Sequence, residues 1–116
     1  MFDLIIRGGA VYDGTGRPAR WADVAVSGGK IAAVEPLPQA RAARVIDARG
    51  KWVTPGFIDI HRHADAAAFR PGFGELELRQ GLTTIVNGNC GLSCAPVGPE
   101  NLPAILSYLE PICGRG

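Results

Sequence analysis

The pattern of apolar and polar positions divides the chain near residue 53 into two regions of different periodicity. Before that point, short apolar runs alternate with glycine-containing pairs, which is typical of β-strands joined by tight turns. We expect hairpins around Gly8-Gly9, Gly28-Gly29 and Arg49-Gly50. Residues 1–52 are therefore predicted to form a small all-β domain.

Residues 53–116 follow a different pattern, in which strand-like runs alternate with helix-like ones. The predicted order is strand, helix, strand and helix, at 57–60, 75–80, 82–87 and 101–110. The first strand is apolar apart from Asp59, so we expect it to be buried on both faces. Asn101 is expected to cap the second helix and Pro111 to stop it. This βαβα order predicts two units of a parallel α/β sheet.

The composition excludes some classes of protein. The 116 residues are 47% hydrophobic and 20% charged with a formal net charge of +1, which is typical of a soluble globular protein and offers no basic surface to nucleic acid. Residues 1–7 mix charges with a short apolar stretch and predict neither a signal peptide nor a membrane span. A cytoplasmic location without a membrane partner is the default expectation, and an odd cysteine count of three argues against disulfides.

Two histidines follow the first strand of the second region. Successive strand side chains point to opposite faces, so His61 and His63 share a face about 6.5 Å apart and can converge on one metal ion. Asp59 lies on the same face, and we expect its carboxylate to orient one of the histidines. The alternative is a histidine pair that packs or hydrogen-bonds at a strand end without metal.

A cysteine follows the second strand, within the turn Asn-Gly-Asn-Cys-Gly at 87–91. In a parallel sheet this turn lies beside the end of the neighbouring strand, so Cys90 can reach an ion held by His61 and His63. A thiolate with two imidazoles favours Zn²⁺ over Mg²⁺ or Ca²⁺. The alternatives are a buried structural cysteine and, more weakly, a separate zinc site that includes Cys94.

Both stretches resemble the amidohydrolase superfamily. Residues 53–63 are similar to its first barrel strand, with the sequence Val-Thr-Pro-Gly-Phe-Ile-Asp-Ile-His-Arg-His. Residues 79–96 resemble the D-aminoacylase branch, the N-acyl-D-amino-acid deacylases, in which an Asn-Cys-Gly turn follows barrel strand 2. The resemblance implies that His61, His63 and Cys90 are zinc ligands. It also implies an incomplete β-sandwich-like domain at 1–52, followed at 53–116 by the first two β/α units of a TIM-type (β/α)₈ barrel.

A complete barrel of this type takes about 250 residues, so only its beginning fits into this sequence. The family takes further histidine ligands and a catalytic aspartate from later strands, whereas His61 and His63 are the only histidines here. We therefore expect no catalytic residue in this segment, with Asp65 a loop residue. The implied function is the N-terminal segment of a zinc-dependent amidohydrolase that hydrolyses N-acyl amide bonds of D-amino acids and is inactive alone.

Three alternatives remain open. The segment could belong to a cyclic amidase of the dihydroorotase or hydantoinase type, form a non-catalytic metal-binding module, or be one piece of a split barrel. For the deacylase, the expected partners are a small N-acyl amino acid and either the remainder of the barrel or further copies of the chain. Substrate side chain, acyl group and stereochemistry are expected to depend on barrel loops outside these residues.

Overall fold

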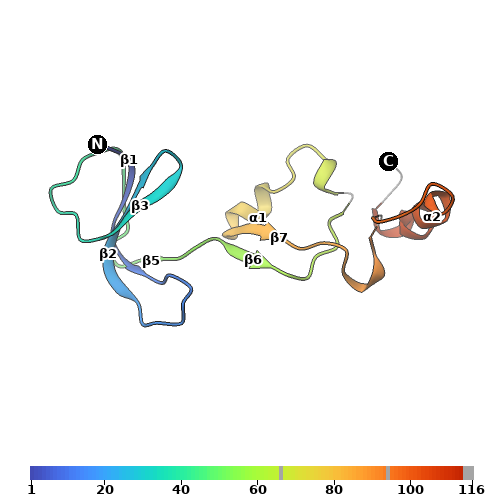
Figure 1. Cartoon of the computed structure of the whole chain (residues 1–116), viewed down its shortest axis with the longest axis horizontal. Helices are drawn as coiled ribbons and strands as arrows, with labels where there is room; N and C mark the ends of the chain where they lie inside the picture. The colour runs from blue at the N-terminus through green and yellow to red at the C-terminus, as the bar shows by residue number, and fades with distance from the viewer. Residues whose placement is uncertain (66, 94, 114–116) are drawn as a thin grey trace. The chain divides into compact units, whose positions relative to one another are not determined.

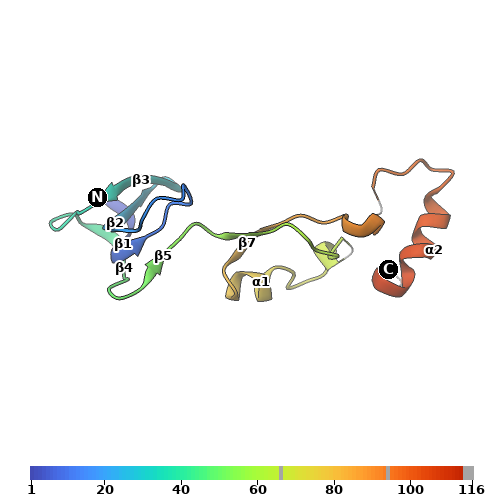
Figure 2. The ribbon, with the colours of Figure 1, turned by 90° about the horizontal axis from the view of Figure 1, so that it is seen from below.

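The computed structural model describes residues 1–65, 67–93 and 95–113, and the chain divides into two compact units, Met1–Pro55 and Gly56–Gly116. The first unit contains five strands, which are β1 Phe2–Val11, β2 Arg20–Ser27, β3 Lys30–Glu35, β4 Ala42–Asp47 and β5 Trp52–Val53 (Figure 1). Four of them lie side by side in the order β3, β2, β1, β4, and β5 pairs with β1 (Figure 2). The described residues of this unit thus form one sheet, and its completion to a sandwich stays a prediction.

The centre of this sheet is β1, which is antiparallel to β2 and parallel to both β4 and β5. Its last residue, Val11, packs with Ala22 and Val24 of β2 in the buried core of the unit. The predicted hairpin at Gly28-Gly29 is confirmed, because β2 and β3 are antiparallel and both glycines have positive φ. A two-residue turn with positive φ at both positions matches the right-handed twist of the strands that it joins.

The hairpin predicted at Gly8-Gly9 is wrong, because β1 runs through both glycines without turning. The pairing of β1 with β2 instead shifts between Ile6 and Gly9, as in a β-bulge, and Gly8 has φ of 70°. A Cβ at Gly9 would lie 2.4 Å from Cγ2 of Val53, so the glycine also permits the close approach of β5. The pair serves a bulge and a close contact, both of which depend on residues distant in sequence.

The hairpin predicted at Arg49-Gly50 is also wrong. Strands β4 and β5 run in the same direction along β1, so the turn between them does not reverse the chain. The backbone of Ala48 donates to the oxygen of Arg7, and the oxygen of Lys51 accepts from Ala10 further along the same strand. The turn therefore carries the chain past the bulge and returns it to the edge of β1.

The second unit contains two strands and two α-helices among its described residues. They are β6 Phe57–Asp59, α1 Glu75–Arg79, β7 Leu82–Ile85 and α2 Leu102–Cys113, with short 3₁₀ turns η1 Ala67–Phe69 and η2 Asn89–Gly91. Strands β6 and β7 are parallel, as the βαβα order predicted, and α1 contacts β7. The backbone of Phe57 donates to the oxygen of Gly81 at 2.8 Å and begins this pairing.

Two expectations for the second unit are wrong. The first strand is not buried on both faces, because Phe57, Ile58 and Ile60 are 56%, 62% and 72% exposed. The apolar pattern belongs to a strand with neighbours on both sides and both faces, and the described part of this sheet supplies one neighbour. Helix α2 also continues past Pro111 to Cys113, since a proline this close to the end of a helix removes only one backbone hydrogen bond. No helix among the described residues is long and apolar enough to cross a membrane.

Candidate metal centre

The two segments that follow β6 and β7 run together beyond the ends of their strands. The backbone of Val86 donates to the oxygen of Asp59 at 2.8 Å, and the backbone of Arg62 donates to the oxygen of Val86 at 3.1 Å. These bonds carry the residues after each strand to the same edge of the sheet. The carboxyl ends of parallel strands are the usual place for ligands in α/β proteins.

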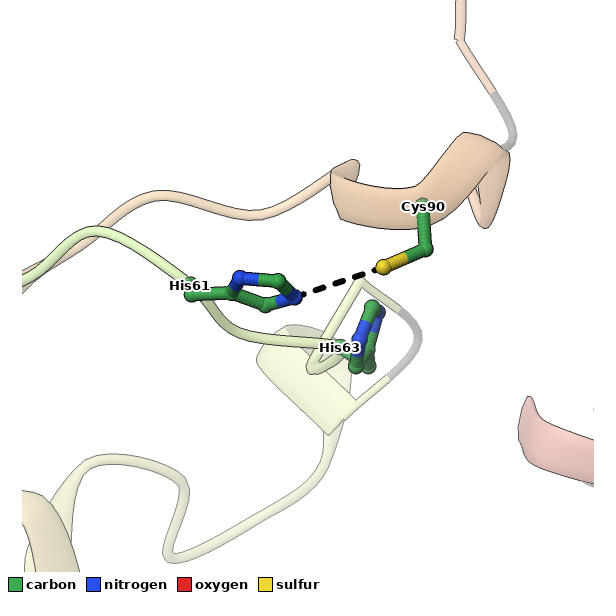
Figure 3. Close-up of side chains that lie close together, drawn as sticks. All are labelled: His61, His63 and Cys90. Atoms are coloured by element: carbon green, nitrogen blue, oxygen red, sulfur yellow. Dashed lines mark hydrogen bonds between the residues drawn. The ribbon is translucent and has the colours of Figure 1, made fainter.

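The structure brings the three predicted ligands together at this edge (Figure 3). Nitrogen atoms of His61 and His63 and the Sγ atom of Cys90 all lie within 4.8 Å of one another. The Sγ atom is 3.3 Å from Nε2 of His61, and the two imidazole centroids are 5.3 Å apart at an interplanar angle of 78°. All three side chains are exposed, so an ion and a further ligand can reach them from solvent.

The distances and the donor set fit zinc. In a tetrahedral zinc site, Zn–N distances of about 2.0–2.1 Å and a Zn–S distance of about 2.3 Å place neighbouring ligand atoms about 3.3–3.6 Å apart. The 3.3 Å between Sγ of Cys90 and Nε2 of His61 matches this spacing. No pair of ligand atoms is more than 4.8 Å apart, so a small side-chain rotation brings the widest pair to the spacing of a zinc site. Three ligands leave the fourth position open, as catalytic zinc sites do.

The predicted roles of the two aspartates can be compared with their contacts. Oδ1 of Asp59 accepts from the backbone nitrogen of His61 at 3.1 Å, so this carboxylate contacts the backbone of the histidine and not its ring. Its Oδ2 lies 3.8 Å from Nε of Arg62. Oδ2 of Asp65, in the loop where it was expected, accepts from the backbone of Gly88 at 3.3 Å and so links the histidine loop to the cysteine turn. Both carboxylates position backbone at the site.

Several residues at the site were missed by sequence reasoning. Arg62, between the histidines, donates to Oε1 of Glu77 on α1 at 2.5 Å and so anchors the histidine loop to the helix. The side chains of Asn87 and Asn89 bond to the backbone of the histidine loop. Two asparagines around a glycine are a signal for a turn held by side chains. Cys90 is a free thiol, and Cys94 lies outside the described residues.

Comparison with known proteins is consistent with this geometry. The chain is 44% identical over 109 residues to a D-aminoacylase of Alcaligenes xylosoxydans xylosoxydans, a match that covers 94% of the chain and 22% of that protein. A solved structure of D-aminoacylase, from a study of its binuclear metal centre, has a TM-score of 0.79 and 49% identity, covering 94% of this chain and 23% of that one. A zinc- and phosphonate-bound N-acyl-D-glutamate deacylase from Bordetella bronchiseptica has a TM-score of 0.77 and 43% identity, covering 90% and 23%.

The chain thus spans less than a quarter of the length of the relatives that it matches. The model of the amidohydrolase family matches residues 44–103, which is more than half of the chain. The matched range includes the strand that leads to both histidines, the whole of β7 and the Cys90 turn. By this match, and by its likeness to the deacylase structures, the chain belongs to the amidohydrolase family.

Proposed function

We propose that this chain is the N-terminal segment of a zinc-dependent amidohydrolase that hydrolyses the N-acyl amide bond of D-amino acids. Residues 1–52 form the β domain of the composite enzyme, and residues 53–116 form the first two β/α units of its (β/α)₈ barrel. The observation that carries the proposal is the convergence of His61, His63 and Cys90 within 4.8 Å at the carboxyl ends of two parallel strands. The deacylase relatives support the choice of substrate class.

The chain's own residues contribute the ion site and its geometry. The two imidazoles and the thiolate of Cys90 would hold zinc. Asp59 and Asp65 accept hydrogen bonds from the backbone of His61 and Gly88 and so fix the segments that carry these ligands. A zinc ion held there would lower the pKa of a water to about 7, and it would polarise the substrate carbonyl. The carboxylate that moves the proton comes from a later strand of the barrel. We therefore expect no hydrolysis of N-acyl-D-amino acids by these 116 residues above a metal-only blank.

The exposed edge of the β6–β7 sheet supports the proposed partner, which is the rest of the barrel. Ile58 and Ile60 expose more than half of their surface, and a neighbouring strand and helix layer would remove this surface from water. Self-association of the chain is the alternative way to cover it. Turnover by the chain alone that His61→Ala abolishes would contradict its role as an inactive segment.

Competitive zinc titration tests the proposed centre against the cyclic-amidase alternative. In the cyclic amidases that this alternative resembles, no metal ligand follows the second strand. Cys90→Ser replaces a thiolate by a weakly acidic hydroxyl, and we expect zinc affinity to fall by at least about tenfold. Cys94→Ser is the matched control and is expected to change affinity little. Equal affinity of the wild type and Cys90→Ser would make Cys90 structural and favour the cyclic amidase. Absence of zinc binding by the wild type would remove the centre altogether.

A further inference from the structure

Asparagine side chains connect the turn after β7 to the histidine loop on both sides of His63. Nδ2 of Asn89 donates to the backbone oxygen of Arg62 at 3.3 Å and to that of Val86 at 2.9 Å. Oδ1 of Asn87 accepts from the backbone nitrogen of Ala64 at 3.1 Å. Arg62 and Ala64 are the two chain neighbours of His63, so these bonds fix the loop immediately before and after a proposed ligand.

The residue held by this turn has an unfavourable backbone conformation. Cys90 has φ of 58° and ψ of 23°, which is the left-handed region, and it is the one non-glycine residue with positive φ among those that the structure describes. This conformation costs a residue with a Cβ about 1–3 kcal/mol and persists only where neighbouring contacts enforce it. It directs the thiol toward His61, with Sγ 3.3 Å from Nε2.

The bonds of Asn89 are placed to enforce that conformation. Asn89 directly precedes Cys90. Its side-chain Nδ2 atom donates both to the backbone oxygen of Val86, which follows β7, and to that of Arg62 on the histidine loop. Asn89 and its bond to Arg62 are partly buried, whereas its bond to Val86 is exposed, so water competes less for the bond to Arg62 than for a bond at the surface. Losing them would free the turn to relax, and the thiol would move away from the imidazoles.

We propose, on the basis of the zinc centre proposed above, that Asn89 is a positioning residue that holds Cys90 in the left-handed conformation and its sulfur within reach of the shared ion. Partners that orient metal ligands typically change metal affinity by about 10- to 100-fold when they are removed. Asn89 acts through its nitrogen, as a donor. Asn87 acts through its oxygen, as an acceptor.

This difference supplies a matched pair of variants. An aspartate has the shape of asparagine but cannot donate when ionised. Asn89→Asp therefore loses both of its bonds, whereas Asn87→Asp keeps its bond to the Ala64 backbone, and each variant adds one negative charge within the same turn. Any effect of charge alone appears in both variants, and the effect of the lost donor appears in one.

The experiment is a Co²⁺ titration of the full chain, followed by the sulfur-to-cobalt charge-transfer absorption that reports a bound thiolate. We expect Asn89→Asp to lose most of this absorption, as Cys90→Ser does, and to bind Co²⁺ about tenfold more weakly while imidazole binding persists. Asn87→Asp is expected to keep both the absorption and the affinity within about threefold of the wild type. A residue that only stabilised the fold would not selectively remove the sulfur-to-cobalt absorption of the Co²⁺-bound chain.

Each other outcome is decisive. Equal absorption and affinity in the wild type and Asn89→Asp would overturn the positioning role and leave the metal centre intact. Equal losses in both asparagine variants would assign the effect to charge and overturn it too. If circular dichroism shows that only Asn89→Asp unfolds, Asn89 is a general stabiliser and the proposal fails. A wild-type chain that binds no Co²⁺ through sulfur would overturn the metal centre and the role of Asn89 with it.

Discussion

Replacing Gly56 by alanine should separate the two strands that carry the candidate site. Gly56 precedes β6 and lies against Thr83 of β7, where an added Cβ would be 2.1 Å from Oγ1, 2.2 Å from Cγ2 and 2.6 Å from Cβ. Rotation about χ1 can move the first two atoms but not the Cβ of Thr83. Because ordinary contacts begin at 3.4 Å, the backbones of the two strands must move apart at this point.

The cost follows from the size of this overlap. Forcing an extra methyl group into a close contact typically costs about 1–3 kcal/mol. At 1.4 kcal/mol for each factor of ten, the pairing of β6 with β7 should open about 5- to 140-fold more often. Native-state hydrogen exchange measures this directly at the amides of Phe57 and Val86, which bond to Gly81 and Asp59 across the strand pair.

Two further variants make the test specific. Gly98→Ala is the control, because the backbone of Gly98 is outside the left-handed region and an added Cβ would meet only the flexible carboxylate end of Glu100. The second variant adds Gly56→Ala to a Thr83→Gly chain, which lacks the clashing side chain, and here the alanine should have little effect. Unchanged exchange at both amides in Gly56→Ala, or an equal loss of protection in the presence and absence of the Thr83 side chain, would refute the reasoning.

Three other predictions concern stability, pH and assembly. Asp23→Ala leaves the backbone nitrogens of Gly8 and Leu37 without their carboxylate acceptor. At about 1–3 kcal/mol for each unpaired group, the free energy of unfolding should fall by at least about 2 kcal/mol, measured by urea unfolding with tryptophan fluorescence. A fall below about 0.5 kcal/mol would contradict this role of Asp23. Hydrogen bonds from the guanidinium and the backbone N–H of Arg49 hold the pKa of Asp47 at about 2, so the stability that this carboxylate contributes is present above pH 4 and is lost toward pH 2. Arg49→Gln removes the guanidinium and keeps the backbone N–H, so NMR titration should show the pKa of Asp47 rise part of the way toward 3.8, and an unchanged pKa would rule out the guanidinium as the main cause. The isolated chain should self-associate through its exposed apolar strand edges, and a stable monomer at micromolar concentration in sedimentation would argue against this.

The sequence predicted the candidate site better than it predicted the first unit. The parallel pairing of β6 and β7 follows from strand and helix periodicity, and the convergence of His61 and Cys90 follows from that pairing. By contrast, Gly8-Gly9 and Gly28-Gly29 look alike in sequence, because a hairpin and a bulge both use positive φ. Only distant contacts decide between them, and the sequence does not display those contacts.

The hydrogen bonds around the site were also beyond sequence reasoning. The role of Arg62 depends on Glu77, fifteen residues later, and the salt bridge exists only because α1 contacts β7. The left-handed conformation of Cys90 could not be read from the residue itself, since cysteine has no preference for it. Local preference and the observed conformation disagree at this position, as is common where backbone strain serves a function.

The conformation of Cys90 also has a consequence for how such sequences diverge. Glycine adopts the left-handed region at no steric cost, so Cys90→Gly relieves about 1–3 kcal/mol of strain while it removes the sulfur. Selection for folding alone therefore favours glycine at this position, and only selection for the thiol opposes it. Descendants that no longer depend on the sulfur should lose the cysteine early and gain thermal stability. The residue found after the Asn-Gly-Asn sequence would then show whether a lineage still depends on the thiol of the candidate metal centre.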